Sequence, residues 1–223
     1  MQDQDLRAAL DEVADDLWFT VCRCDEEPLA AALSGNLAKL VSDCDTADAH
    51  HKKKLRRAKT KADAGAVAAR GRVEAFANTL SKKLLGLVNQ DRADVRFAKY
   101  MTKPASELVG LDRERLRDWL SAVVDTGAVE TDKAILALVK PAAGLRDKWD
   151  AAEASRSSAE AALAHHRTTV KEPLLAAINA ERRILLASLV QIAAKEKLGK
   201  KWPQTFFRSA HKAKKPAPTA PAP

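Results

Sequence analysis

Aromatic residues, glycine and cysteine are scarce in this chain of 223 residues: aromatics make up 4% of it, with eight glycines and three cysteines. Sheet proteins are enriched in β-branched and aromatic residues, whereas Ala, Leu and charged residues dominate here and favour helix. The composition therefore predicts an all-α protein.

Long apolar runs are also missing. The longest, from Ile184 to Ala194, is interrupted by Ser188 and Gln191 and is shorter than the roughly 18 to 20 residues that a membrane helix needs. Residues 1–5 are polar and acidic, unlike a secretory signal. We therefore expect a cytoplasmic protein without a membrane span.

The cysteine count is odd, and without an export signal reduced thiols are expected. Cys22 and Cys24 are two positions apart, which on a helix turns their side chains about 200° from each other, so they cannot share a metal ion there. We predict that Cys22 is a small core residue one turn from Trp18 and that Cys24 lies on the surface. Neither a metal nor a cofactor is expected.

The longest regular pattern runs from Leu55 to Val88 and predicts a long amphipathic helix reaching about Asn89. Four residues before it, Ser42, Asp43, Asp45 and Thr46, are plausible N-caps; the alternative is one continuous helix from Pro28. The predicted apolar stripe consists of Leu55, Ala58, Ala62, Ala66, Ala69, Val73, Phe76, Leu80, Leu84 and Leu87.

Shorter helices are predicted before and after this one. Helical spacing indicates helices over residues 3–24 and 28–41, a polar connector over 90–103, and a helix that ends at Gly127 in a C-terminal cap position. A short helix over 135–139 precedes a second long stretch over 145–198, which Pro173 should kink or split.

The two halves of the chain resemble each other at a shift of about 101 residues, which suggests a degenerate duplication. Asp11 then aligns with Asp112 and Trp18 with Trp119, and we expect both tryptophans to be buried at equivalent sites. At a shift of 102, Val88 aligns with Val190. Chance alignment of two Ala- and Leu-rich helices is the alternative. With duplication, we expect an elongated helical bundle of two long antiparallel helices, with halves over 1–103 and 104–210 and a disordered Ala/Lys/Pro tail over 211–223.

Charge is distributed unevenly along the chain. Residues 1–49 carry twelve acids and three bases, while the whole chain has a net charge of +8. The densest basic run, residues 50–61, contains seven Lys or Arg and no acid. Its simplest interpretation is the solvated surface of the long helix; contact with phosphate is the alternative. The acidic N-terminal region could also neutralise this run within the molecule.

A second basic segment, over residues 195–215, interleaves Lys and Arg with Trp202, Phe206 and Phe207, a combination that can bind nucleic acid by charge and stacking. The aromatic residues could equally anchor the chain end on the bundle. The candidate anion contacts of the two segments are Lys52, Lys53, Lys54, Arg56, Arg57, Lys59, Lys61, Lys200, Lys201, Lys212, Lys214 and Lys215.

Motifs of known chemistry are mostly missing. Residues 104–116 faintly suggest a helix-turn-helix with Arg113, Arg115 and Arg117 on its second helix, but the first helix is too short, which favours a helix that Asp112 caps. The chain contains no Gly-rich phosphate loop, nucleophile elbow or His-Glu-x-x-His sequence. His165 and His166 are expected beside the helix stripe without a chemical role.

These features predict a non-enzymatic structural or protein-interaction protein, which presents long helix faces, coiled-coil fashion, to a protein partner or to a second copy of itself. A sequence-independent nucleic-acid-associated protein is the alternative.

Overall fold

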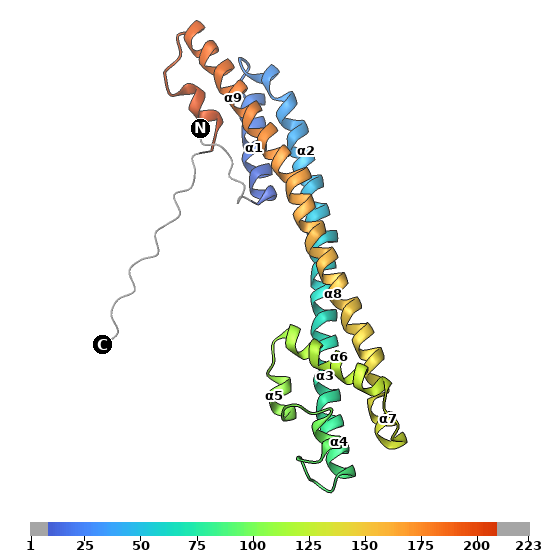
Figure 1. The fold of residues 1–223 in the computed structure, drawn as a ribbon. Coiled ribbons are helices and arrows are strands. Elements are labelled where there is room, and N and C mark those ends of the chain that lie inside the picture. The colour runs from blue at the N-terminus through green and yellow to red at the C-terminus, as the bar shows by residue number, and fades with distance from the viewer. Residues whose placement is uncertain (1–8, 209–223) are drawn as a thin grey trace, which may run out of the picture. The chain divides into compact units, whose positions relative to one another are not determined.

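The computed structural model describes residues 9–208, and 82% of these residues are helical, with no strand among them (Figure 1). The predicted all-α class is confirmed. Within the same range, no helix combines the length and the apolar character needed to cross a membrane. The predicted tail, residues 211–223, lies outside the described range.

The described chain divides into two compact units. The first unit combines residues 9–54 with residues 163–208, and the second consists of residues 55–162. The predicted boundary between residues 103 and 104 therefore falls inside the second unit.

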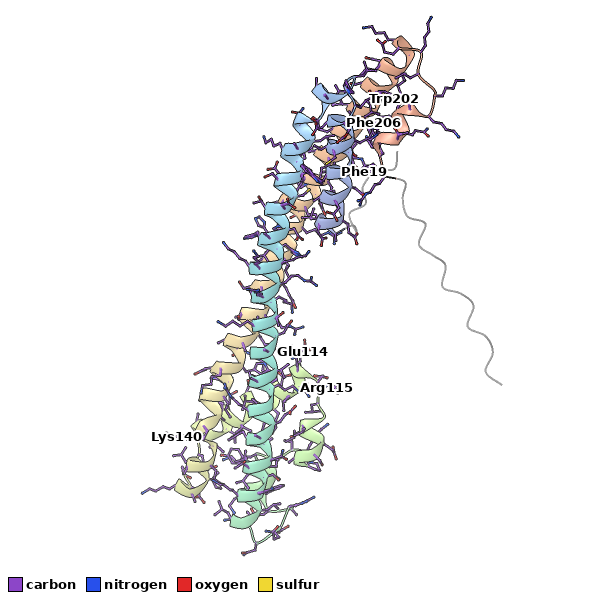
Figure 2. All side chains as sticks on the ribbon, turned by 180° about the vertical axis from the view of Figure 1, so that it is seen from behind. Phe19, Glu114, Arg115, Lys140, Trp202 and Phe206 are labelled. Atoms are coloured by element: carbon purple, nitrogen blue, oxygen red, sulfur yellow. The ribbon has the colours of Figure 1, made fainter. Side chains whose placement is uncertain are left out.

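Three helices lie side by side in the first unit: α1 (Leu10–Asp25), α2 (Gly35–His50) and α9 (Glu172–Lys195). The short 3-10 helices η1 (Ala31–Leu33) and η4 (Trp202–Phe206) complete it. Figure 2 shows Trp202 and Phe206 of η4 in the region of Phe19 on α1, which supports the anchoring interpretation of these aromatic residues. The core of this unit includes Leu17, Leu37, Ile178, Leu189 and Phe206.

The buried face of α1 differs from the predicted one. Trp18 is 54% exposed, Cys22 is exposed and Cys24 is buried, so all three assignments were wrong. Thr20 takes an inward position between Leu17 and Cys24, and its hydroxyl is satisfied there because it donates to the carbonyl oxygen of Asp16 at 3.1 Å. With Thr20 inward, the buried face turns away from Trp18.

Helix α2 runs through the residues predicted as N-caps, so that prediction was wrong. The hydroxyl of Thr46 donates to the carbonyl oxygen of Ser42 at 2.9 Å, which bonds it to its own helix instead of to a helix end. The π-helical segment η2 (His51–Arg56) and helix α3 (Arg57–Leu87) follow directly. The alternative of one continuous helix describes this stretch better, although its α-helical part begins at Gly35 rather than at Pro28.

The second unit contains α3, α4 (Val95–Ala98), α5 (Ala105–Val109), α6 (Arg113–Ala128), α7 (Lys133–Val139) and, up to residue 162, α8 (Pro141–His166). Its core joins the C-terminal half of α3 to residues from every other helix of the unit. The predicted connector contributes to it, because Phe97, Tyr100 and Met101 are all buried. Positive φ angles at Asn89 and Gln90 (50° and 66°) turn the chain at the end of α3.

The predicted stripe of α3 is correct in its middle and wrong at its ends. Ala62, Ala66, Ala69, Val73, Leu80 and Leu84 are buried. Ala58 and Leu87 are exposed, and Val88 is buried in place of Leu87. Both Leu87 and Val88 are apolar, so spacing alone could not decide which of them faces the core.

Gly127 was predicted to end its helix in a C-terminal cap position, and this was wrong. It lies buried within the last turn of α6. A Cβ atom placed there would be 2.9 Å from Cγ2 of Val139 on α7. The absence of a side chain allows α6 and α7 to approach each other.

The two prolines of the second long stretch behave differently. Pro141 opens α8, where its missing N–H leaves no bond unmade. Before Pro173 the chain forms the π-helical segment η3 (Arg167–Lys171), and the N–H of Glu172 donates to the carbonyl oxygen of Arg167, five residues back. The interruption predicted at Pro173 therefore takes the form of a π-helical turn.

Burial does not match at the aligned positions of the suggested repeat. Trp119 is 6% exposed against 54% for Trp18, and Val88 is 4% exposed against 51% for Val190. The duplication gains no support from these pairs.

Candidate functional site

The basic run begins in the first unit with a lysine that is already paired. Nζ of Lys52 lies 2.6 Å from a carboxylate oxygen of Asp11 on α1 and 3.0 Å from one of Asp48. Hydrogen bonds to Asp11 and then Asp48 raise the pKa of Lys52. The acidic N-terminal region thus neutralises this residue. Lys53 and Lys54 are exposed and form no ion pair among the described residues.

In the second unit the run continues with one further paired lysine. Lys59 bonds to Asp63 and lies 3.0 Å from Glu160 of α8. Within the described range, Arg56, Arg57 and Lys61 are exposed and have no ion-pair partner. Two of the seven predicted cations are therefore committed to acids of the same chain, and five are available to solvent.

The C-terminal cations are only partly described. Lys200 and Lys201 are exposed between α9 and η4. Lys212, Lys214 and Lys215 lie outside the described residues.

The arginines of the suggested helix-turn-helix are all engaged with acids of the second unit. Arg113 lies 3.3 Å from Glu153 and Arg117 lies 2.8 Å from Asp150. Arg115 lies 3.4 Å from Asp112, whose side chain accepts the backbone N–H of Arg115 at 2.9 Å. This bond confirms the favoured alternative, a helix capped by Asp112. The first helix of the suggested helix-turn-helix is indeed short, since α5 has only five residues.

A histidine cluster lies in the first unit, where sequence reasoning expected no special arrangement. The ring of His166 stacks on those of His50 and His51, with centroids 5.6 and 5.5 Å apart. His166 is 6% exposed, and its Nε2 has no hydrogen-bond partner among the described residues. Burial is the main cause that lowers the pKa of His166, followed by the charges of His51 and His50.

In the described part of the chain, no group of three or more His, Cys, Asp or Glu side chains is arranged to hold a metal ion. Burial raises the pKa of both Cys24 and Cys44 to about 11, so both remain protonated thiols at neutral pH. The two adjacent histidine pairs, His50-His51 and His165-His166, were the signal in the sequence that could have located the cluster.

The exposed row of α1 is the second feature that sequence reasoning missed. We call it the Trp18 face, and it consists of Asp11, Asp15, Trp18 and Cys22, which are three or four residues apart and all exposed. The neighbouring Phe19 is held from the other side by Arg208, whose guanidinium lies 5.5 Å from the ring centroid. Trp18 therefore presents its ring to solvent on a helix that is otherwise well anchored.

Comparisons of the chain with protein-family models, with curated proteins and with solved structures found no match.

Proposed function

We propose that the chain is a non-enzymatic helical interaction protein, and that its Trp18 face binds a basic surface of a protein partner. The observation that carries the proposal is the 54% exposure of Trp18. Tryptophan is among the residues that contribute most to binding energy at protein interfaces. The core of the first unit is completed by Leu17 and Val21, and does not need this ring.

The neighbours of Trp18 favour a cationic partner. Asp15 precedes Trp18 by one helical turn and is exposed, whereas Asp11, two turns before Trp18, is already paired with Lys52. A Lys or Arg of a partner could bond to Asp15 and lie over the indole ring, an arrangement that contributes about 0.5 to 2 kcal/mol. A second copy of the chain carries suitable cations in its own basic run, so self-association is one form of this function.

The experiment places a photo-crosslinking amino acid at position 18 in the full chain, and at Val190 as the matched control. Val190 lies on α9 of the same unit and is 51% exposed. We expect a discrete adduct from position 18, with the crosslinked peptide of the partner rich in Lys or Arg, and much less adduct from position 190. Sedimentation velocity then shows whether the partner is a second copy.

Equal, diffuse labelling from both positions would reject the Trp18 face as an interface. A discrete adduct whose partner peptide is acidic or neutral would reject the proposed charge complementarity.

A nucleic-acid-associated function remains the second candidate, and the observation that favours it is the set of five exposed cations without ion pairs among the described residues. Phosphate contacts of this kind require neither base recognition nor a pocket. The salt dependence of binding tests it, as set out in the Discussion.

A further inference from the structure

A hollow of about 350 Å³ lies in the second unit, between the segment after α4 and helix α6. This volume is at the lower end of the range typical of small-molecule sites, which begins at about 300 Å³. The side chains that form its apolar floor are Tyr100, Leu108, Leu111, Trp119 and Val123. A ligand of two or three aromatic rings would fit such a space.

The two aromatic residues of the floor are fixed by hydrogen bonds. Nε1 of Trp119 donates to the carbonyl oxygen of Tyr100 at 3.0 Å, and the hydroxyl of Tyr100 donates to Glu130 at 2.5 Å. Their polar atoms are thus already satisfied within the protein. The ring surfaces that remain toward the hollow are apolar and are held in place before any ligand binds.

The rim of the hollow carries three cations, Lys99, Lys103 and Arg115, against one acid, Asp118. Lys99 is neutralised by Glu130 at 2.8 Å. Lys103 is exposed and forms no ion pair within the described range, and Arg115 pairs only with Asp112, in a contact that is exposed on both sides. An apolar floor beneath one lysine that is unpaired among the described residues and one arginine that is held only by an exposed ion pair suits a ligand with an aromatic body and one negative group.

We propose that this hollow binds a small aromatic anion, with its ring system over Trp119 and its anionic group beside Lys103 and Arg115. Figure 2 shows Arg115 near the start of α6. The site belongs to the second unit alone and does not depend on the function proposed for the Trp18 face.

The experiment compares two probes with the same rings in the full chain. The anionic probe is 8-anilinonaphthalene-1-sulfonate, and the neutral one, N-phenyl-1-naphthylamine, lacks the sulfonate. Binding is followed by probe fluorescence at low salt. We expect Lys103→Gln and Arg115→Gln each to weaken binding of the sulfonate about two- to fivefold, as for one exposed ionic contact, and to leave the neutral probe unchanged. Lys133→Gln, an exposed change at the start of α7, is the matched control and should alter neither probe.

A second variant tests the location. Ala122 lines the hollow and is exposed, so Ala122→Trp fills the space without disturbing the core, and circular dichroism checks the helix content. We expect it to weaken both probes at least tenfold. Unchanged binding to Ala122→Trp, an equal effect of the charge changes on both probes, or no binding of either probe to the wild-type chain would each overturn the proposal.

Discussion

The close approach of α6 and α7 at Gly127 allows a quantitative test. Replacing an exposed helical glycine by alanine stabilises a helix by about 1 kcal/mol, because the backbone of the unfolded chain loses freedom. Gly71 on α3 is such a position, because beyond its chain neighbours and the backbone of its own helix no atom lies within 4 Å of the added Cβ. At Gly127 the same Cβ would lie 2.9 Å from Cγ2 of Val139, and overpacking of this kind costs about 1 to 3 kcal/mol.

The cost cannot easily be relieved, since valine on a helix has one strongly preferred side-chain rotamer. We therefore expect Gly71→Ala to raise the free energy of unfolding by about 1 kcal/mol. The free energy of unfolding of Gly127→Ala should be about 1 to 3 kcal/mol lower than that of Gly71→Ala. In a Val139→Ala background, where the clashing methyl group is removed, Gly127→Ala should regain most of the helix-propensity gain.

Urea unfolding followed by tryptophan fluorescence measures these differences. Trp119 and Trp149 are buried in the second unit, so a background of Trp18→Phe and Trp202→Phe makes the signal report on that unit alone. If Gly127→Ala stabilises the protein as much as Gly71→Ala does, the close packing of α6 on α7 is refuted.

Three further predictions concern single residues and the basic run. Trp119→Ala should destabilise the second unit by about 3 to 5 kcal/mol, whereas Trp18→Ala should change stability by less than about 0.5 kcal/mol; equal losses in urea titrations would contradict the burial difference. The pKa of His166 is lowered in the folded state, so near and below pH 6.5 the unfolded chain binds more protons than the folded chain. The stability that neutral His166 provides above that pH should therefore be lost on acidification. His166→Gln should flatten this dependence in thermal unfolding measured against pH, and the exposed neighbour change His165→Gln should not; the same acid loss in both variants would exclude His166 as its source. The last prediction replaces four exposed cations of the basic run by Gln, namely Lys53, Lys54, Arg56 and Arg57. If the chain binds nucleic acid through this run, the slope of log affinity against log salt should decrease by several units while circular dichroism shows an intact fold. No binding at low salt would eliminate this function.

The sequence predicted the helices better than it predicted their contacts. Spacing located the middle of the α3 stripe and the cap at Asp112, because apolar periodicity and a capping side chain act within a few residues. It failed where two neighbouring residues could equally face the core. On α1 a buried position is occupied by Thr20, whose hydroxyl is satisfied by its own backbone, a contact that no hydrophobic pattern represents.

The features that define the candidate sites depend on contacts between distant segments. His166 is buried against His50 and His51, more than one hundred residues earlier in the chain. Lys52 looked like part of a free basic surface until the structure placed Asp11 beside it. Charge counts along the sequence cannot separate a paired lysine from an available one, since pairing depends on the path of the chain.

Regular spacing also says little about how strongly a helix is held. Over residues 150–162, α8 has no buried residue, and it is joined to the rest of the second unit by partly exposed ion pairs such as Arg156 with Asp63 and Lys59 with Glu160. Exposed pairs contribute about 0.2 to 1 kcal/mol each. The facing part of α3 buries Ala62, Ala66 and Ala69, whose methyl groups remove little apolar area from water. The most regular part of the sequence is thus held by weak contacts, while the core around Trp119 and Trp149 supplies the burial that stabilises the unit.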